Sequence, residues 1–225
     1  MTAILDYDAG NTESMRLALE KVGAKPEVTC DIAKLARAQR LVFPGVGSAA
    51  QCMRILRERR LDQVIRDAFR DGKPILAVCI GIQLLFDRSE EDGGVPALGV
   101  FPGQVERFIP PPDDPGVKIP HMGWNRVRFL APHPILPPPG GYGEFYFVHS
   151  YYPVPAWEDT AVRHLPPLPG RPGGKVYGAT DHAGVDFAAI VGLGSCLATQ
   201  FHPEKSGEVG LAILERFKTW DGQTC

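Results

Sequence analysis

The 225-residue chain lacks three features that would assign it to a specialised class of protein. It has no marked excess of charge of either sign, since its formal net charge is −2, which argues against nucleic acid as a principal partner. It has no apolar run long enough to span a membrane, and its N-terminus lacks the basic and then apolar pattern of a secretory signal. We therefore expect a protein of the cytoplasm that does not act at a membrane.

Paired cysteines are absent as well. The five cysteines are odd in number, scattered and without C-x-x-C spacing: Cys30, Cys52, Cys79, Cys196 and Cys225. This pattern predicts neither a disulfide framework nor a zinc site. The histidines are too dispersed along the chain to indicate a metal cluster, although folding could gather them. We expect no metal.

The apolar residues that are present predict an α/β fold. The first half alternates strands at 3–7, 27–30 and 40–43 with helices at 11–22, 48–60 and from Leu61 onward. Strands dominate the second half, at 100–108, 125–130, 144–152, 175–180, 187–191 and 196–200, and proline-rich loops are expected at 110–115 and 132–139. Residues 153–174 are expected to form a surface insertion. Residues 1–225 should form one domain, a three-layer sandwich around a central, mostly parallel mixed sheet with a strand-rich second half.

Cys79 is the first candidate for a chemical role. It follows Ile75-Leu76-Ala77-Val78, which reads as a buried strand, and Gly81 then opens a helix. Such a turn exposes the side chain at the carboxyl end of the sheet and leaves the first helical amides free to bind a developing oxyanion. The alternative is a buried thiol that acts as a small hydrophobe, but that role requires no glycine two residues later. The pattern favours a nucleophile elbow.

A base for this thiol is expected near the C-terminus, in Phe201-His202-Pro203-Glu204. A thiol is mostly protonated at neutral pH, so a cysteine nucleophile needs a base or a nearby positive charge, and His202 can supply both. In an extended segment, residues two apart share a face, which would let Glu204 orient and stabilise the imidazole. A surface histidine followed by a helix-leading acid remains the alternative for each residue taken singly.

Together these residues resemble the catalytic triad of class I glutamine amidotransferases, and within that family the glutaminase subunits of imidazole glycerol phosphate synthase. The motifs that carry the resemblance span nearly the whole chain and are Asp6-Tyr7 with Gly10-Asn11, Pro44-Gly45-Val46-Gly47, Pro120-His121-Met122-Gly123-Trp124-Asn125, Tyr146-Phe147-Val148-His149-Ser150-Tyr151 and Gln200-Phe201-His202-Pro203-Glu204-Lys205-Ser206. The resemblance implies hydrolysis of the glutamine amide by Cys79, His202 and Glu204, with no cofactor.

The resemblance also implies roles for residues around the elbow. The glycines of the loop after residues 40–43 let backbone amides approach a ligand closely. By resemblance, an amide of Val46 or Gly47 supplies half of an oxyanion hole and the amide of Ile80 supplies the other half. Substrate contacts are likewise implied for Gly45, Gln83, His149, Ser150 and Tyr151.

Free ammonia would be protonated and diluted in water, so the chain is expected to be one half of a complex. The resemblance implies a (β/α)8-barrel cyclase as partner, with Asn11, Trp124, Tyr146 and Lys205 at the interface. Glycine and asparagine beside Trp124 indicate a turn at the surface, which favours an interface anchor. Two alternatives remain open from the residues alone: another amidotransferase or a stand-alone cysteine hydrolase on the same sheet, and a non-catalytic binding module.

Overall fold

A computed structural model describes residues 1–8, 11–112, 116–158 and 161–224. Four features named from the sequence lie at least partly outside these residues: Gly10 of the first motif, the end of the proline-rich loop at 110–115, residues 159–160 of the expected surface insertion, and Cys225. No helix in the described part of the chain combines the length and the apolar character needed to cross a membrane.

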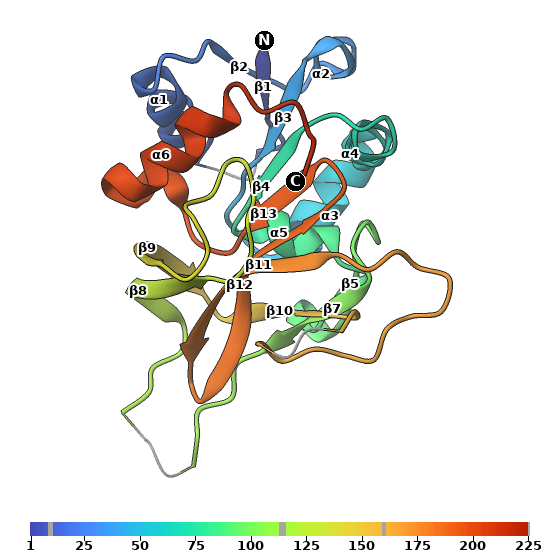
Figure 1. Ribbon diagram of the computed structural model, residues 1–225. Coiled ribbons are helices and arrows are strands. Elements are labelled where there is room, and N and C mark those ends of the chain that lie inside the picture. Colours follow the sequence, from blue (N-terminus) through green and yellow to red (C-terminus); the bar gives the residue numbers. More distant parts are fainter. Residues whose placement is uncertain (9–10, 113–115, 159–160, 225) are drawn as a thin grey trace.

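A nine-stranded sheet forms the centre of the molecule, in the order β2-β1-β3-β4-β13-β12-β11-β8-β9 (Figure 1). Neighbours from β2 to β13 pair in parallel, and neighbours from β13 to β9 pair antiparallel. The strands are β1 Thr2–Leu5, β2 Pro26–Thr29, β3 Arg40–Phe43, β4 Ile75–Val78, β8 His121–Phe129, β9 Tyr142–His149, β11 Lys175–His182, β12 Val185–Leu193 and β13 Cys196–Thr199. The prediction of a central mixed sheet is confirmed.

Helices cover both faces of the parallel half of the sheet. Successive side chains of each strand point to opposite faces, and because the strand residues are apolar on both faces, each face is packed against helices. In β4, Ile75 and Ala77 pack with α2, α3, α4 and α5, whereas Leu76 and Val78 pack with α1 and α6. The helices are α1 Thr12–Lys21, α2 Ile32–Arg37, α3 Ala49–Glu58, α4 Leu61–Arg70, α5 Ile80–Leu85 and α6 Gly207–Phe217. The expected three layers are therefore present.

A second, four-stranded sheet was not predicted. Its order is β10-β7-β5-β6, formed by Tyr151–Pro155, Gly103–Arg107, Arg88–Ser89 and Val95–Pro96. The single strand expected at 144–152 was wrong, because the chain leaves the main sheet at Ser150 and continues in the second sheet as β10. The start of the expected surface insertion at 153–174 was also wrong, since residues 153–155 belong to β10 and are buried.

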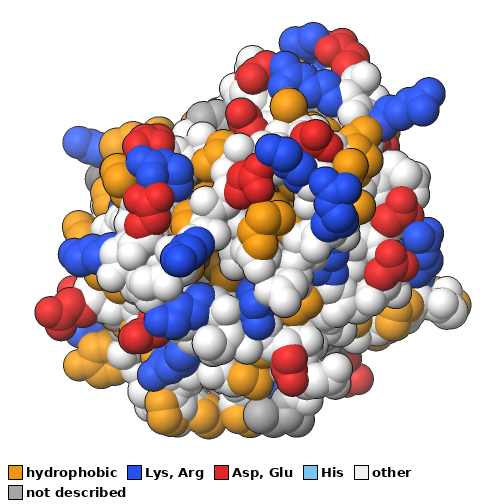
Figure 2. All heavy atoms as spheres, turned by 90° about the horizontal axis from the view of Figure 1, so that it is seen from above, with side chains coloured by type: hydrophobic (Ala, Val, Ile, Leu, Met, Phe, Trp, Pro, Cys, Tyr) orange, Lys and Arg blue, Asp and Glu red, His pale blue; other side chains and the backbone are white. Residues whose placement is uncertain are grey.

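Charged side chains of both signs are mixed over the end of the molecule that carries the N-terminus (Figure 2). Charged residues also form ion pairs along single helices, such as Arg16 with Glu13 and Glu20 in α1. Exposed pairs of this kind contribute little to stability, but their mixed signs match the small net charge of the chain.

Candidate active site

Cys79 occupies a strained turn between β4 and α5. Its φ of 56° and ψ of −110° are rare for a residue with a side chain, and its amide is held by the Thr199 carbonyl at 2.8 Å. A Cβ added to Gly81 would lie 2.3 Å from the Phe43 carbonyl oxygen. The glycine therefore lets α5 pack directly on the end of β3, as the elbow pattern predicts.

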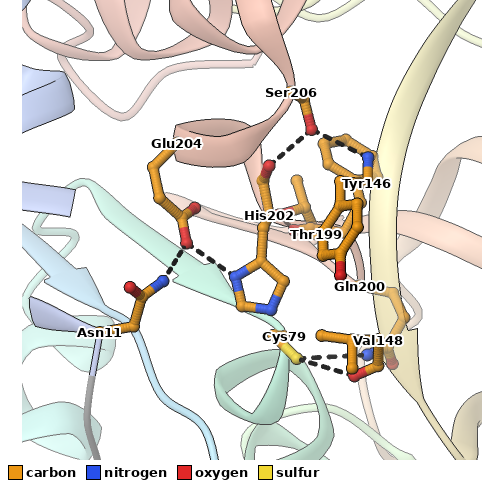
Figure 3. A network of polar contacts seen from close by, with 10 residues as sticks. Asn11, Cys79, Tyr146, Val148, Thr199, Gln200, His202, Glu204 and Ser206 are labelled. Atoms are coloured by element: carbon orange, nitrogen blue, oxygen red, sulfur yellow. Dashed lines mark hydrogen bonds and ion pairs between the residues drawn. The ribbon is translucent and has the colours of Figure 1, made fainter. Parts of the chain in front are cut away.

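The side chains of His202 and Glu204 lie beside this turn and are almost completely buried, each 1% exposed. Nδ1 of His202 lies 2.7 Å from Oε1 of Glu204, and the Asn11 amide donates to the same carboxylate oxygen at 2.5 Å. Nε2 of His202 points toward Cys79 (Figure 3), and it has no hydrogen-bond partner among the described residues. The structure thus brings the three predicted triad residues together and adds Asn11 behind them.

The charges around His202 favour its protonated form. Burial lowers the pKa of the imidazole, but the nearby Cys79 thiolate and the Glu204 carboxylate outweigh this effect and raise the pKa above its ordinary value. An imidazolium next to the thiolate is the arrangement that a cysteine nucleophile requires at neutral pH.

The backbone around His202 differs from the sequence interpretation. Pro203–Lys205 forms a 3-10 turn, η2, so His202 and Glu204 do not lie in one extended segment as expected. The turn is fixed to the edge of the main sheet, because the Ser206 hydroxyl donates to the His202 carbonyl at 2.5 Å and accepts from the Tyr146 amide at 3.0 Å (Figure 3). Proline at the first position of η2 suits this geometry.

A cavity of about 330 Å³ opens over the elbow. Besides Cys79, its lining includes seven of the residues singled out from the sequence, namely Val46, Gly47, Ile80, Gln83, His149, Ser150 and Tyr151. Gly45 does not line it. A Cβ there would lie 2.0 Å from the Tyr7 hydroxyl and 2.3 Å from Cγ2 of Ile80, so Gly45 instead lets the loop pack against the start of α5.

Gln83 and His149 are already engaged by other protein groups. The Gln83 amide donates to the Tyr151 carbonyl at 3.0 Å and to the Gln200 side chain at 3.1 Å. Both ring nitrogens of His149 are in hydrogen bonds, to the Tyr151 carbonyl at 2.7 Å and to His121 at 3.0 Å. These contacts shape the cavity wall at Tyr151.

Glu91 is a cavity residue that the sequence analysis missed. One carboxylate oxygen accepts from the Ala49 amide at 2.7 Å, and burial raises the pKa of the carboxyl group. It lies in η1, Glu91–Gly93, within an acidic run that looks like an ordinary exposed surface. Only the approach of this run to the N-terminus of α3, far away in sequence, places a carboxylate at the cavity.

Of the four residues expected at the partner interface, Trp124 and Tyr146 lie on β8 and β9, Lys205 lies in η2, and Asn11 precedes α1. Trp124 is 58% exposed and stands opposite Tyr146, with ring centroids 6.3 Å apart, and the Lys205 ammonium lies 5.9 Å from the Tyr146 ring. Trp124 lies within a strand, so the surface turn inferred from its glycine and asparagine neighbours was wrong. Asn11 is engaged by Glu204.

The chain matches a family model over residues 3–219, nearly its whole length, and that model is described as "Glutamine amidotransferase class-I". The chain belongs to the class-I glutamine amidotransferases. Among curated relatives of this amidotransferase, "Imidazole glycerol phosphate synthase subunit HisH" of Geobacillus thermodenitrificans is 44% identical over 224 residues, covering 96% of this chain and 94% of the relative. The protein of the same name in Acinetobacter baylyi is 43% identical, with 97% and 98% covered.

Solved structures share the amidotransferase fold at low sequence identity. "Structure of PurLQS from Thermotoga maritima" matches with a TM-score of 0.68 and 16% identity, covering 96% of each chain. "Crystal structure of glutamine amidotransferase" matches with a TM-score of 0.66 and 18% identity, covering 96% of this chain and 98% of the other. The family and the fold class expected from the sequence are confirmed.

Proposed function

We propose that this amidotransferase is the glutaminase subunit of an imidazole glycerol phosphate synthase. It hydrolyses glutamine to glutamate and passes the ammonia to a (β/α)8-barrel cyclase subunit, which forms imidazole glycerol phosphate and an aminoimidazole carboxamide ribotide in histidine biosynthesis. The observation that carries the proposal is the buried Nε2 of His202, which has no hydrogen-bond partner in the described part of the chain and faces Cys79 beside a cavity of about 330 Å³. Relatives named for this subunit match nearly the full chain.

The reaction begins with attack of the Cys79 thiolate on the carbon of the glutamine side-chain amide. His202, held protonated by its neighbours, gives its Nε2 proton to the departing ammonia and leaves a γ-glutamyl thioester. Neutral His202 then takes a proton from water, and the resulting hydroxide hydrolyses the thioester, which frees the Cys79 thiolate beside protonated His202. The new carboxyl group releases its proton to solvent and leaves as glutamate. Glu204, supported by Asn11, holds the ring in one tautomer through both steps.

Two backbone segments are proposed to stabilise the oxyanion of each tetrahedral intermediate. The amide of Ile80 is the first of α5 and has no acceptor within its own helix. The loop that carries Val46 and Gly47 lines the same cavity as Ile80 and is proposed to supply the second donor. Losing one such donor typically costs a rate factor on the order of 10²–10³.

The far end of the cavity is proposed to hold the amino-acid end of the substrate. Glu91 offers a partly buried carboxylate for the α-ammonium group, and the Ser150 and Tyr151 corner of the same cavity is proposed to hold the α-carboxylate. Gln83 and His149 hold the Tyr151 carbonyl of this corner in place, and Gly45 lets the loop of Val46 and Gly47 pack against the start of α5.

The partner is proposed to dock on the outer face of β8 and β9. Trp124 supplies a large exposed apolar surface beside Tyr146, and Lys205 adds a charge at its edge. Exposed aromatic side chains of this kind are the usual anchors of protein interfaces. We place the complex in the cytoplasm, a reducing compartment that keeps the nucleophilic thiol free.

The test is to assemble the chain with the barrel subunit and to measure product formation with glutamine and, separately, with ammonium salt. Cys79→Ala should lower the glutamine-dependent rate by about 10⁴-fold or more and leave the ammonium-dependent rate unchanged. Glutamine-dependent synthesis that survives in Cys79→Ala would contradict the mechanism. A glutaminase that works at full rate without the barrel subunit would contradict the proposed assembly.

A further inference from the structure

A row of hydrogen bonds joins the strand that carries Trp124 to the wall of the cavity. Nδ2 of Asn125 lies 3.2 Å from Nε2 of His121, and Nδ1 of His121 lies 3.0 Å from Nε2 of His149. Nδ1 of His149 reaches the Tyr151 carbonyl at 2.7 Å. Folding thus gathers histidines that are far apart in the sequence, and it gives them a hydrogen-bonded arrangement.

The row continues from Tyr151 to the nucleophile. The Tyr151 carbonyl also accepts from Gln83, whose amide donates to the Gln200 side chain. The Gln200 amide in turn contacts Sγ of Cys79 at 4.0 Å. The position of the Tyr151 carbonyl is therefore fixed from two sides, by His149 and by Gln83.

The chemistry of the groups sets the direction of every proton in the row. A carbonyl only accepts, so Nδ1 of His149 carries a proton and its Nε2 is the acceptor of a neutral ring. His121 must then donate from Nδ1 and accept from Asn125 at Nε2. Burial keeps both rings neutral, because it lowers the pKa of His121 to about 3 and lowers that of His149 well below its ordinary value.

Packing holds His121 in this orientation. Its ring stacks on Phe147 at 4.7 Å and on His182 at 4.2 Å, and the residue is only 5% exposed. The second amide hydrogen of Asn125 is used by the Asp181 carbonyl at 2.8 Å. His121 is absent from the cavity lining, whereas His149 and Tyr151 belong to it, so His121 can act on a ligand only through its neighbours.

We propose that His121 is a positioning residue for glutamine binding, which acts through His149 on the Ser150 and Tyr151 corner of the cavity. Without the proton donated by His121, the buried Nε2 of His149 loses its partner, and the ring is free to release the Tyr151 carbonyl. The corner then loses one of its two supports, and the site binds glutamine less tightly. This inference rests on the proposed function.

The test compares two amide variants of His121 in the assembled complex with the barrel subunit. Asparagine places an amide donor near the position of Nδ1 and retains the bond to His149, whereas glutamine places its amide near Nε2 and retains only the bond to Asn125. We expect the KM for glutamine to rise on the order of 10-fold in His121→Gln and to stay near that of the unchanged complex in His121→Asn. The value of kcat should change little in either variant.

Two further measurements separate positioning from a general loss of stability. If His121 acts only through His149, the double variant His121→Gln with His149→Phe should have the same KM as His149→Phe alone. His133→Phe is the matched control, because His133 is another buried histidine with a lowered pKa that lies outside the row. Its KM should stay unchanged even if its melting temperature falls.

Equal KM values for His121→Asn and His121→Gln would overturn the inference. It would also be overturned if the fold-increase in KM of the double variant equalled the product of the increases in the two single variants. These outcomes are distinct from failure of the proposed function. An unchanged complex that releases no glutamate from glutamine contradicts the proposed function, and this inference falls with it. An active complex with equal KM values in both amide variants contradicts the inference alone.

Discussion

Replacing Gly45 by alanine tests the proposed role of the loop that faces the elbow. The added methyl group would lie 2.0 Å from the Tyr7 hydroxyl and 2.3 Å from Cγ2 of Ile80, both much closer than van der Waals contact. Neither neighbour can retreat easily, because Tyr7 is fully buried and bonded to the Pro44 carbonyl and Ile80 begins α5. The loop must therefore move by about 1 Å, and a misplacement of that size can cost about 10²-fold in rate.

The assay is glutaminase activity of the complex, with Gly141→Ala as the matched control. At Gly141 the nearest atom to an added Cβ is the Pro138 carbonyl at 3.6 Å, an ordinary contact, and its backbone is not left-handed. We expect kcat to fall about 10²-fold in Gly45→Ala and to stay within about 3-fold in Gly141→Ala. Overpacking should also lower the melting temperature of Gly45→Ala by a few degrees. A folded Gly45→Ala protein with normal kcat would refute the reasoning.

Further predictions concern the triad, the interface and a buried histidine. Glu204→Gln removes a charge that raises the pKa of His202, so the alkaline limb of the pH profile of kcat should move to lower pH; an unmoved limb would count against the ion pair. Asn11→Ala should lower kcat about 10-fold when the barrel subunit is present at saturating concentration, because Asn11 supports Glu204. A variant with normal kcat and weaker binding of the barrel subunit would instead indicate that Asn11 acts at the interface. Trp124→Ala should weaken partner binding about 30-fold by titration, and unimpaired binding would exclude it as an anchor. Burial lowers the pKa of His133 to about 4, so as pH falls below about 6.5 the unfolded chain takes up a proton at this residue before the folded protein does, and the folded protein loses stability. Between pH 7 and pH 5, the free energy of unfolding should therefore fall by about 2 kcal/mol less in His133→Phe than in the unchanged protein. Urea unfolding at the two pH values measures this, and equal losses in the two proteins would contradict it.

Much of the fold could be predicted because local signals and tertiary contacts agree. The apolar run before Cys79 is a buried strand, and Gly81 is required by the Phe43 carbonyl that it approaches. The sequence analysis missed helix α2, which has only six residues. A local signal was present, because the Asp31 side chain caps this helix by accepting hydrogen bonds from the backbone amides of Ala33 and Lys34.

Other features could not be predicted because they depend on segments far apart in the sequence. No glycine or proline marks the break at Ser150, where the chain passes from one sheet to the other, so the strand pattern continues through it. Glu91 meets the N-terminus of α3 only after folding. In the same way, the bond from Asn11 to Glu204 joins residues at opposite ends of the chain.

The most direct test of the account is to identify the atom that carries the acyl group. The complex should be quenched in acid during turnover of glutamine, digested, and analysed by mass spectrometry. The account predicts a γ-glutamyl group on the peptide that contains Cys79, sensitive to hydroxylamine as a thioester and absent in Cys79→Ala. An acyl group on another residue, or glutamate formation at the normal rate in Cys79→Ala, would contradict it.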